Sequence, residues 1–178
     1  MTVPDVERVR SRSLWLETCG DDLTPRPSLS GDADADVVVV GGGLTGLWTA
    51  LYLREQAPDC RVVVLEAEVC GFGASGRNGG WCSALFPTSL DQLAVQAGRD
   101  AAIAQHRAMI DTVDVVGREV ERLGIDCHWA RGGTVTVATN PAHVGRIRSY
   151  VDERHRWGFG ETDDRWLSPT EMAERVRP

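Results

Sequence analysis

The 178-residue sequence lacks several features that would place it in a common class of protein. It has no run of 18 apolar residues, which argues against a membrane-spanning helix. Its N-terminus has no apolar core of signal-peptide length. Its formal net charge of −7 argues against a nucleic-acid-binding surface and against binding to anionic membranes. Together these absences favour a cytoplasmic protein without a membrane span.

The sequence also lacks the patterns of a disulfide framework and of a metal site. Its five cysteines are odd in number and irregularly spaced, which predicts reduced thiols. They are Cys19, Cys60, Cys70, Cys82 and Cys127. The four histidines are scattered without paired ligand spacing, so we expect no metal site. No catalytic dyad or triad can be recognised, and no catalytic residue is nominated.

What the sequence does contain is a glycine-rich turn between a predicted strand and a predicted helix. An apolar run at Val37–Val40 leads into GGGLTG at 41–46, and a helix is predicted from Leu44 to about Gln56. A second apolar run, Arg61–Leu65, ends on Glu66. Strand, glycine turn, helix, strand and acid in this order form the dinucleotide-binding fingerprint in its confirming context. A buried strand and helix with a chance glycine turn is the alternative interpretation.

Each glycine of this first loop has a physical role in the fingerprint. Gly41 permits the sharp turn out of the strand, Gly43 lets a pyrophosphate approach the backbone, and Gly46 lets the helix lie close to the sheet. The helix N-terminus at Leu44 and Thr45 directs N–H groups and the positive end of the dipole at the phosphates. We expect Leu47, Ala50, Leu51 and Leu53 to form a broad buried stripe on this helix.

The acid after the second strand indicates which dinucleotide is bound. Glu66 is placed to accept hydrogen bonds from the adenosine ribose, and its charge would repel a 2′-phosphate, which argues against NADP. Ala67, which follows it, is assigned to the same site.

A second loop at 71–80 contains five glycines in ten residues. Such a run lets backbone N–H groups turn toward an anion or a flat ring. Ser75 can donate its hydroxyl to a phosphate, Arg77 adds charge, and Asn78 can bond a polar ring edge. Composition alone would also fit a flexible surface loop, but its position directly after the ribose-binding acid favours a cofactor.

Three segments, DVVVVGGGLTGLWTALYL, VVVLEA and GFGASGRNGGW, resemble the D-amino-acid-oxidase-type FAD-dependent oxidoreductases. Within them the chain is most similar to the gamma-glutamylputrescine oxidoreductase-like amine oxidases, and SLWLET and GIDCHWARGGTVTVATNP extend the likeness over most of the chain. The resemblance implies FAD as cofactor, with the first loop on the pyrophosphate and Glu66 on the ribose. It places Ala74 and Ser75 along the pyrophosphate, and Arg77, Asn78 and Gly79 nearer the flavin ring, and Gly73 is assigned to the same cofactor site.

The same resemblance implies a reaction. A primary or secondary amine or an amino acid would lose hydride from its α-carbon to flavin, and the imine would hydrolyse in water. A flavin monooxygenase or an NADH-dependent reductase is an alternative, although the chain has no second GxGxxG for NADH. Family members are more than twice this long, so a truncated, non-catalytic FAD-binding fragment is a further alternative.

Two residues after the second loop leave alternatives open. For Cys82 an ordinary buried thiol is favoured over a covalent link to flavin. Trp81 could equally pack against the loop or border the flavin.

The predicted fold class is α/β, a Rossmann-like FAD-binding βαβ unit followed by the start of a mixed α+β substrate domain. We expect a polar lead-in at 1–35, the N-terminal part of the FAD-binding domain at 36–123 and a truncated substrate domain at 124–178. Beyond the βαβ unit, the patterns predict a helix from Ser89 to about Leu123 broken near Gly98, strands at Cys127–Ala130 and Thr134–Thr139, a helix at Pro141–Trp157, and a capping box at Ser168.

Overall fold

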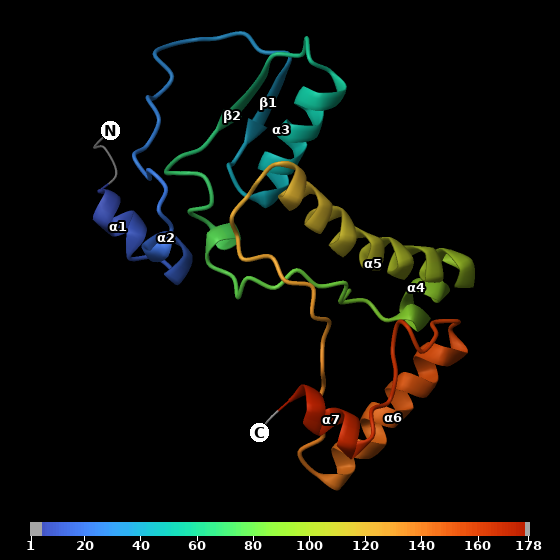
Figure 1. Cartoon of the computed structure of the whole chain (residues 1–178). Coiled ribbons are helices and arrows are strands. Elements are labelled where there is room, and N and C mark those ends of the chain that lie inside the picture. Colours follow the sequence, from blue (N-terminus) through green and yellow to red (C-terminus); the bar gives the residue numbers. More distant parts are fainter. Residues whose placement is uncertain (1–4, 177–178) are drawn as a thin grey trace. The chain divides into compact units, whose positions relative to one another are not determined.

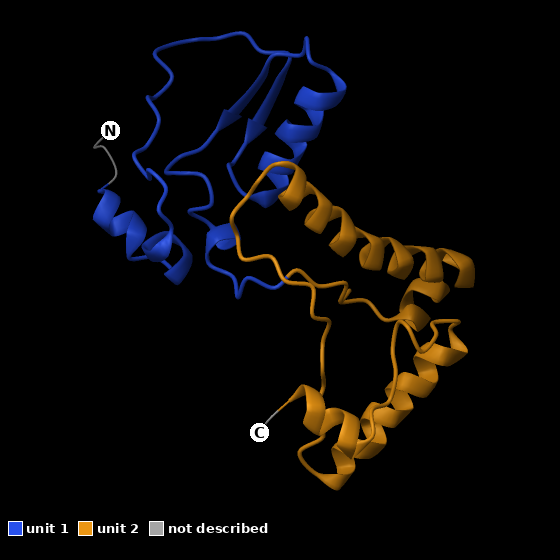
Figure 2. Ribbon diagram, viewed as in Figure 1, with its two compact units in different colours: residues 1–81 blue, residues 82–178 orange. Residues whose placement is uncertain are grey.

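The computed structural model describes residues 5–176, and it divides the chain into two compact units, Met1–Trp81 and Cys82–Pro178 (Figure 2). Unit 1 contains helices α1 (Val6–Arg10) and α2 (Leu14–Thr18), strand β1 (Val37–Val40), helix α3 (Leu44–Gln56), strand β2 (Val62–Leu65) and the 3-10 helix η1 (Ala74–Gly76). Unit 2 contains α4 (Leu90–Ala97), α5 (Arg99–Arg122), α6 (Pro141–Arg156) and α7 (Pro169–Arg175) (Figure 1). The domain boundaries at 35 and 123 stay a prediction, because this division reports compactness and not cofactor or substrate binding.

The predicted βαβ unit is confirmed. Strands β1 and β2 pair in parallel, with Val37 opposite Val62 and Val40 opposite Leu65, and α3 connects them and packs against both. At the start of the strands, the Arg61 N–H donates to Asp36 Oδ2 at 2.8 Å. The Arg61 guanidinium pairs with the same carboxylate and lowers the pKa of Asp36. These contacts help to fix the register of β1 against β2, and the first glycine loop begins where β1 ends.

The prediction of a broad buried stripe on α3 is wrong. No residue of α3 is fully buried: Leu47 is 40% exposed, and Ala50, Leu51 and Leu53 are half-buried. The reason is that α3 covers only two strands of four residues each. On the sheet face away from α3, Val40 is 84% exposed.

The lead-in contains two short helices that the sequence interpretation missed. Asp5 caps α1 by accepting from Glu7 N, and Ser13 caps α2 by accepting from Leu16 N. Val9 and Leu16 are buried, and they pack with Leu23 and Val69 in the core of unit 1. Residues 19–35 have no regular structure.

The helical predictions for unit 2 are confirmed. Gly98, with φ of +88°, separates α4 from α5, and Gly124, with φ of +62°, follows the end of α5. Asn140 caps α6, and the side chain and backbone of Ser168 exchange hydrogen bonds with Glu171 in a capping box. The core of this unit consists of Leu90, Ala102, Trp157 and Phe159.

The two strands expected at Cys127–Ala130 and Thr134–Thr139 are wrong, since β1 and β2 are the only strands within residues 5–176. An isolated two-stranded hairpin is marginally stable in water, and these segments have no third strand to pair with. Side chains hold this region instead: Arg131 pairs with Asp114 of α5 at 2.9 Å. The substrate domain therefore stays a prediction.

Within residues 5–176, no helix combines the length and apolar character needed to cross a bilayer.

Candidate functional site

The first glycine loop, residues 41–46, makes a tight turn from β1 into α3. Gly41 has φ of +100°, a conformation that side chains rarely adopt, and its N–H donates to Leu65 O at 2.7 Å. A Cβ on Gly46 would lie 2.1 Å from Gly41 O and 3.1 Å from Val39 Cγ1. The glycine pattern therefore has the steric basis that the fingerprint requires: the turn itself at Gly41, and close packing of α3 on β1 at Gly46.

The N-terminus of α3 retains hydrogen-bond donors. The first bond within the helix runs from Leu47 N to Gly43 O at 2.9 Å, so the N–H groups of Leu44, Thr45 and Gly46 lie before it. Leu44 N donates to Ser75 Oγ at 2.9 Å. In the described part of the chain the N–H groups of Thr45 and Gly46 have no acceptor, and they stand at the positive end of the helix dipole. This donor set suits a pyrophosphate.

Glu66 lies at the end of β2 and bonds the first loop directly. Its Oε2 accepts from Gly42 N at 2.7 Å, and its Oε1 accepts from Glu68 N at 3.1 Å. A carboxylate has about four acceptor positions, so two remain for ribose hydroxyls. Glu66 and the following Ala67 are both exposed, as a ligand contact requires.

Gly42 was missed by sequence reasoning because the fingerprint leaves that position unspecified. It is buried, and a Cβ there would lie 2.8 Å from Cys70 Sγ and 3.3 Å from Glu66 Oε2. The signal was present as the middle glycine of GGG at 41–43.

The second glycine loop, residues 71–80, folds against the first. Gly71 N donates to Gly42 O at 2.9 Å, and η1 turns the chain so that Ser75 reaches Leu44. Arg77 Nε donates to Gly73 O at 3.1 Å, so the guanidinium braces its own loop. The Asn78 side chain donates to Ser75 O at 2.7 Å and accepts from Gly80 N at 2.7 Å. The polar side chains expected to face a cofactor thus also hold the loop in shape.

All the predicted cofactor residues lie in unit 1, and hydrogen bonds join the three segments that carry them. They are Gly41, Gly43, Leu44, Thr45 and Gly46 in the first loop, Glu66 and Ala67 after β2, and Gly73, Ala74, Ser75, Arg77, Asn78 and Gly79 in the second loop. The two loops approach closely at Gly43, where a Cβ would lie 2.9 Å from Ser75 Oγ. At Gly41, Gly73 and Gly79 a Cβ would meet nothing within 4 Å, so the backbone there is open to the approach of a dinucleotide.

The two residues after the second loop differ from expectation. Trp81 is 92% exposed, which contradicts the alternative in which it packs against the loop, whereas the alternative in which it borders the flavin stays a prediction. Cys82 is exposed and not buried, although partial desolvation of its thiol raises its pKa. A raised pKa leaves less thiolate, which weakens the case for a covalent bond to flavin.

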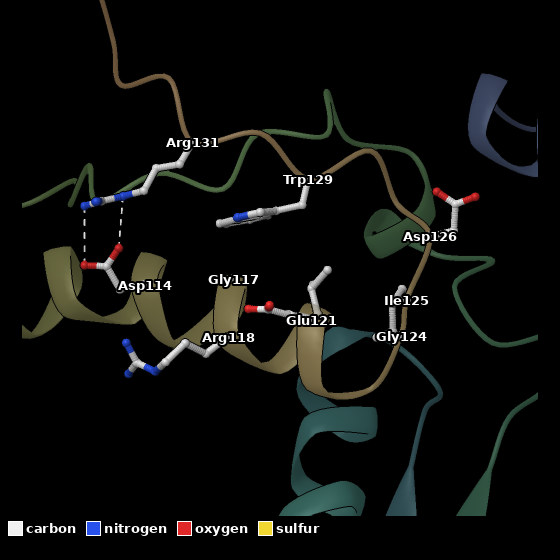
Figure 3. A pocket seen from close by; sticks show the side chains of 10 residues that line it. Asp114, Gly117, Arg118, Glu121, Gly124, Ile125, Asp126, Trp129 and Arg131 are labelled. Atoms are coloured by element: carbon white, nitrogen blue, oxygen red, sulfur yellow. Dashed lines mark hydrogen bonds and ion pairs between the residues drawn. The ribbon is translucent and has the colours of Figure 1, made fainter.

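Unit 2 has a separate open cleft of about 610 Å³ beside the second half of α5. In Figure 3 the Trp129 ring lies over Gly117, and Arg131 reaches Asp114 across one side of the cleft. None of the predicted cofactor residues lines it. The Trp129 ring and the ion pair between Arg131 and Asp114 attach the segment after α5 to that helix. We therefore assign this cleft no part in cofactor binding.

Comparison with known proteins agrees with this geometry. The family model described as DAO, FAD dependent oxidoreductase, matches residues 36–178. A Haemophilus influenzae protein named "Probable oxidoreductase OrdL" is 32% identical over 93% of the chain, and the gamma-glutamylputrescine oxidoreductase of Escherichia coli is 37% identical over 82%. The aligned parts amount to 37% and 34% of those two relatives, so the chain spans about a third of their length. No solved structure matches the chain.

Proposed function

The chain belongs to the DAO family of FAD-dependent oxidoreductases, and from this premise we propose that it binds FAD between its two glycine loops and serves the oxidation of an amine or amino acid. One observation carries the proposal. Ser75 Oγ of the second loop accepts the hydrogen bond from Leu44 N at the N-terminus of α3, which joins both loops around one set of phosphate-binding donors.

In this proposal the first turn of α3 and the second loop hold the pyrophosphate. The N–H groups of Thr45 and Gly46 donate to phosphate oxygens, and the absent side chain of Gly43 lets a phosphate approach the backbone. The hydroxyl hydrogen of Ser75 is available to a phosphate, because the Ser75 oxygen acts as acceptor toward Leu44. Gly73 and Ala74 line the same stretch.

Glu66 binds the adenosine ribose with the acceptor positions that Gly42 and Glu68 leave open. Its negative charge disfavours a 2′-phosphate. Arg77, Asn78 and Gly79 lie nearer the flavin ring, where the main-chain groups of the loop orient its polar edge.

FAD, when bound, supplies the two-electron acceptor that oxidation of a carbon–nitrogen bond needs. The residues of this chain bind and orient the cofactor, and we assign none of them to proton transfer with the substrate. The E. coli relative is named for gamma-glutamylputrescine, and the 37% identity to it supports an amine as the substrate class.

The first experiment is a titration of the purified chain with FAD, followed by flavin fluorescence, with competing nucleotides as a test of the ribose site. We expect saturable binding of one FAD per chain. AMP should displace it, and adenosine 2′,5′-bisphosphate, which differs from AMP only by the 2′-phosphate, should displace it poorly, because Glu66 repels that group. The absence of saturable FAD binding would refute the proposal, and equal displacement by the two nucleotides would refute the role of Glu66.

The second experiment tests whether the chain catalyses amine oxidation. The FAD-loaded chain is mixed with gamma-glutamylputrescine, a secondary amine or an amino acid, and reduction of an artificial electron-acceptor dye is followed. Dye reduction that depends on an amine supports the proposal. FAD binding without amine-dependent reduction would favour the non-catalytic alternative.

A further inference from the structure

The two short helices of the lead-in pack around the start of the second glycine loop. Val9 of α1 and Leu16 of α2 share a core with Val69, and Phe72 packs against it. The guanidinium of Arg8 lies 5.3 Å from the centre of the Phe72 ring and also pairs with Glu68. These helices lie outside the segment that the family model matches, which begins at residue 36.

One side chain of α2 reaches further, to the tip of the second loop. Trp15 Nε1 donates to the main-chain oxygen of Asn78 at 2.7 Å. The edge of its ring lies against Gly80, where a Cβ would be 2.8 Å from Trp15 Cζ2. Gly80 also has φ of +75°, so glycine is required there both by the backbone and by the ring.

Hydrogen bonds continue from this contact to the first glycine loop. Asn78, whose main-chain oxygen accepts from Trp15, donates from its side chain to Ser75 O at 2.7 Å. Ser75 Oγ in turn accepts from Leu44 N at 2.9 Å. Trp15 is therefore connected through Asn78 and Ser75 to the first turn of α3, although it is 63 residues away from Asn78 in the sequence.

We propose that Trp15 is a positioning residue for the cofactor site, which holds the second glycine loop in the conformation that receives FAD. This inference rests on the proposed function, because it concerns the same loops. A glycine-rich loop has large conformational entropy. The Trp15 ring, 44% exposed, lies against Gly80 and bonds Asn78 O, and these two contacts lower the cost of ordering the loop before the ligand arrives. Trp15 therefore acts on the affinity for FAD, by ordering the second glycine loop.

The variants are chosen to separate the two contacts of the indole. Trp15→Phe keeps an aromatic ring near Gly80 and removes the N–H, whereas Trp15→Ala removes both. Trp166→Phe, in unit 2, is the matched control for the loss of an indole. Thermal unfolding of each variant checks that the chain remains folded, and the Phe variant keeps the inference testable if the Ala variant does not fold.

The first readout needs no cofactor. Limited trypsin digestion, followed by mass spectrometry, measures the rate of cleavage after Arg77, an exposed residue within the second loop. We expect Trp15→Phe to raise this rate about three- to tenfold, because it removes a hydrogen bond of ordinary strength. Trp15→Ala should raise it further, and Trp166→Phe should leave it at the wild-type value.

The second readout is FAD affinity by fluorescence titration, with the visible circular dichroism of bound flavin as a signature of its environment. We expect Trp15→Phe to raise the Kd for FAD about three- to tenfold, by the same loss of loop order. The flavin circular dichroism should change in both Trp15 variants and not in Trp166→Phe.

The outcomes separate this inference from the proposed function. If the wild-type chain binds FAD and both Trp15 variants bind it with unchanged Kd, the inference alone is overturned. If loop cleavage is then faster in these variants, the role of Trp15 is purely structural. Wild-type chain that fails to bind FAD would overturn the proposed function and this inference with it. Faster cleavage together with weaker binding supports both.

Discussion

At the scale of single residues, Gly43 is where the two glycine loops constrain each other. A Cβ at this position would lie 2.9 Å from Ser75 Oγ, so Gly43→Ala must displace the hydroxyl that accepts from Leu44. We expect the Kd for FAD to rise about three- to tenfold, which corresponds to the loss of one hydrogen bond. Fluorescence titration measures this change. Gly31→Ala, whose Cβ would meet open space, is the matched control. Unchanged affinity in Gly43→Ala would argue against a phosphate beside this glycine.

His106, on α5, is a residue whose charge state is tied to the folding of unit 2. Its ring lies edge-on to Phe159, with ring centres 6.0 Å apart, and its Nδ1 is 3.2 Å from Arg154 Nη1. Because arginine can only donate, Nδ1 must be the acceptor, and the ring is held neutral with its proton on Nε2. Desolvation, followed by the charge of Arg154, lowers the pKa of His106 below its usual 6.5.

The lowered pKa of His106 predicts a loss of stability in acid. The unfolded chain binds a proton near pH 6.5 and the folded chain only at lower pH, so the contribution of His106 is complete above 6.5 and declines as the pH falls toward the folded pKa. Thermal unfolding between pH 8 and pH 5 should therefore show a steeper fall for wild type than for His106→Gln. His128→Asn, at an exposed histidine whose φ of 53° asparagine tolerates, should follow wild type. Parallel curves for wild type and His106→Gln would contradict the prediction.

At the scale of helices and strands, two helical glycines should respond to alanine in opposite ways. Gly145 of α6 is exposed and a Cβ there meets open space, so Gly145→Ala should stabilise the chain by about 0.5–1 kcal/mol through helix propensity. On α5, a Cβ at Gly117 would lie 2.9 Å from the Trp129 ring, and Gly117→Ala should cost about 1–3 kcal/mol by overpacking. Urea unfolding followed by helical circular dichroism measures both.

The pair is its own control, because the same side chain is added to a helix in each case. Stabilisation by both substitutions would mean that Trp129 does not rest on α5 in solution. Destabilisation by Gly145→Ala would mean that α6 is covered on the face that carries this glycine.

Elements were predictable from the sequence where their determinants are local. The break at Gly98, the start of a helix at Pro141 and the capping box of Ser168 with Glu171 all depend on residues within a few positions, and all are found. The strand at Thr134–Thr139 was predicted from alternation alone, yet a strand also needs a pairing partner, which the described chain does not provide.

The site shows the same distinction between local and distant determinants. Apart from Gly42, the glycines assigned to the site and Glu66 were located by their order in the sequence. The bond from Gly42 to Glu66 joins residues 24 positions apart, and that from Trp15 to Asn78 joins residues 63 apart. No periodicity or motif encodes such contacts, so the support given by the lead-in could be found only in the folded chain.

At the scale of the whole molecule, each unit has a small apolar core of its own. Four buried hydrophobic residues form the core of unit 1, among them Val9 and Leu16, and four form that of unit 2, among them Trp157 and Phe159. Every residue proposed to bind FAD belongs to unit 1. Binding should therefore stabilise the two units unequally.

Hydrogen exchange followed by mass spectrometry can measure this inequality along the chain. At an FAD concentration of about 100 times Kd, binding contributes about 2.7 kcal/mol to the unit that holds the ligand. We expect exchange to slow in peptides from β1, the start of α3 and the second glycine loop, with little change in α5 and α6, which serve as the internal control. Equal protection of α5 and the first glycine loop would contradict a cofactor site confined to unit 1, because a ligand protects most strongly the segments whose opening requires its release.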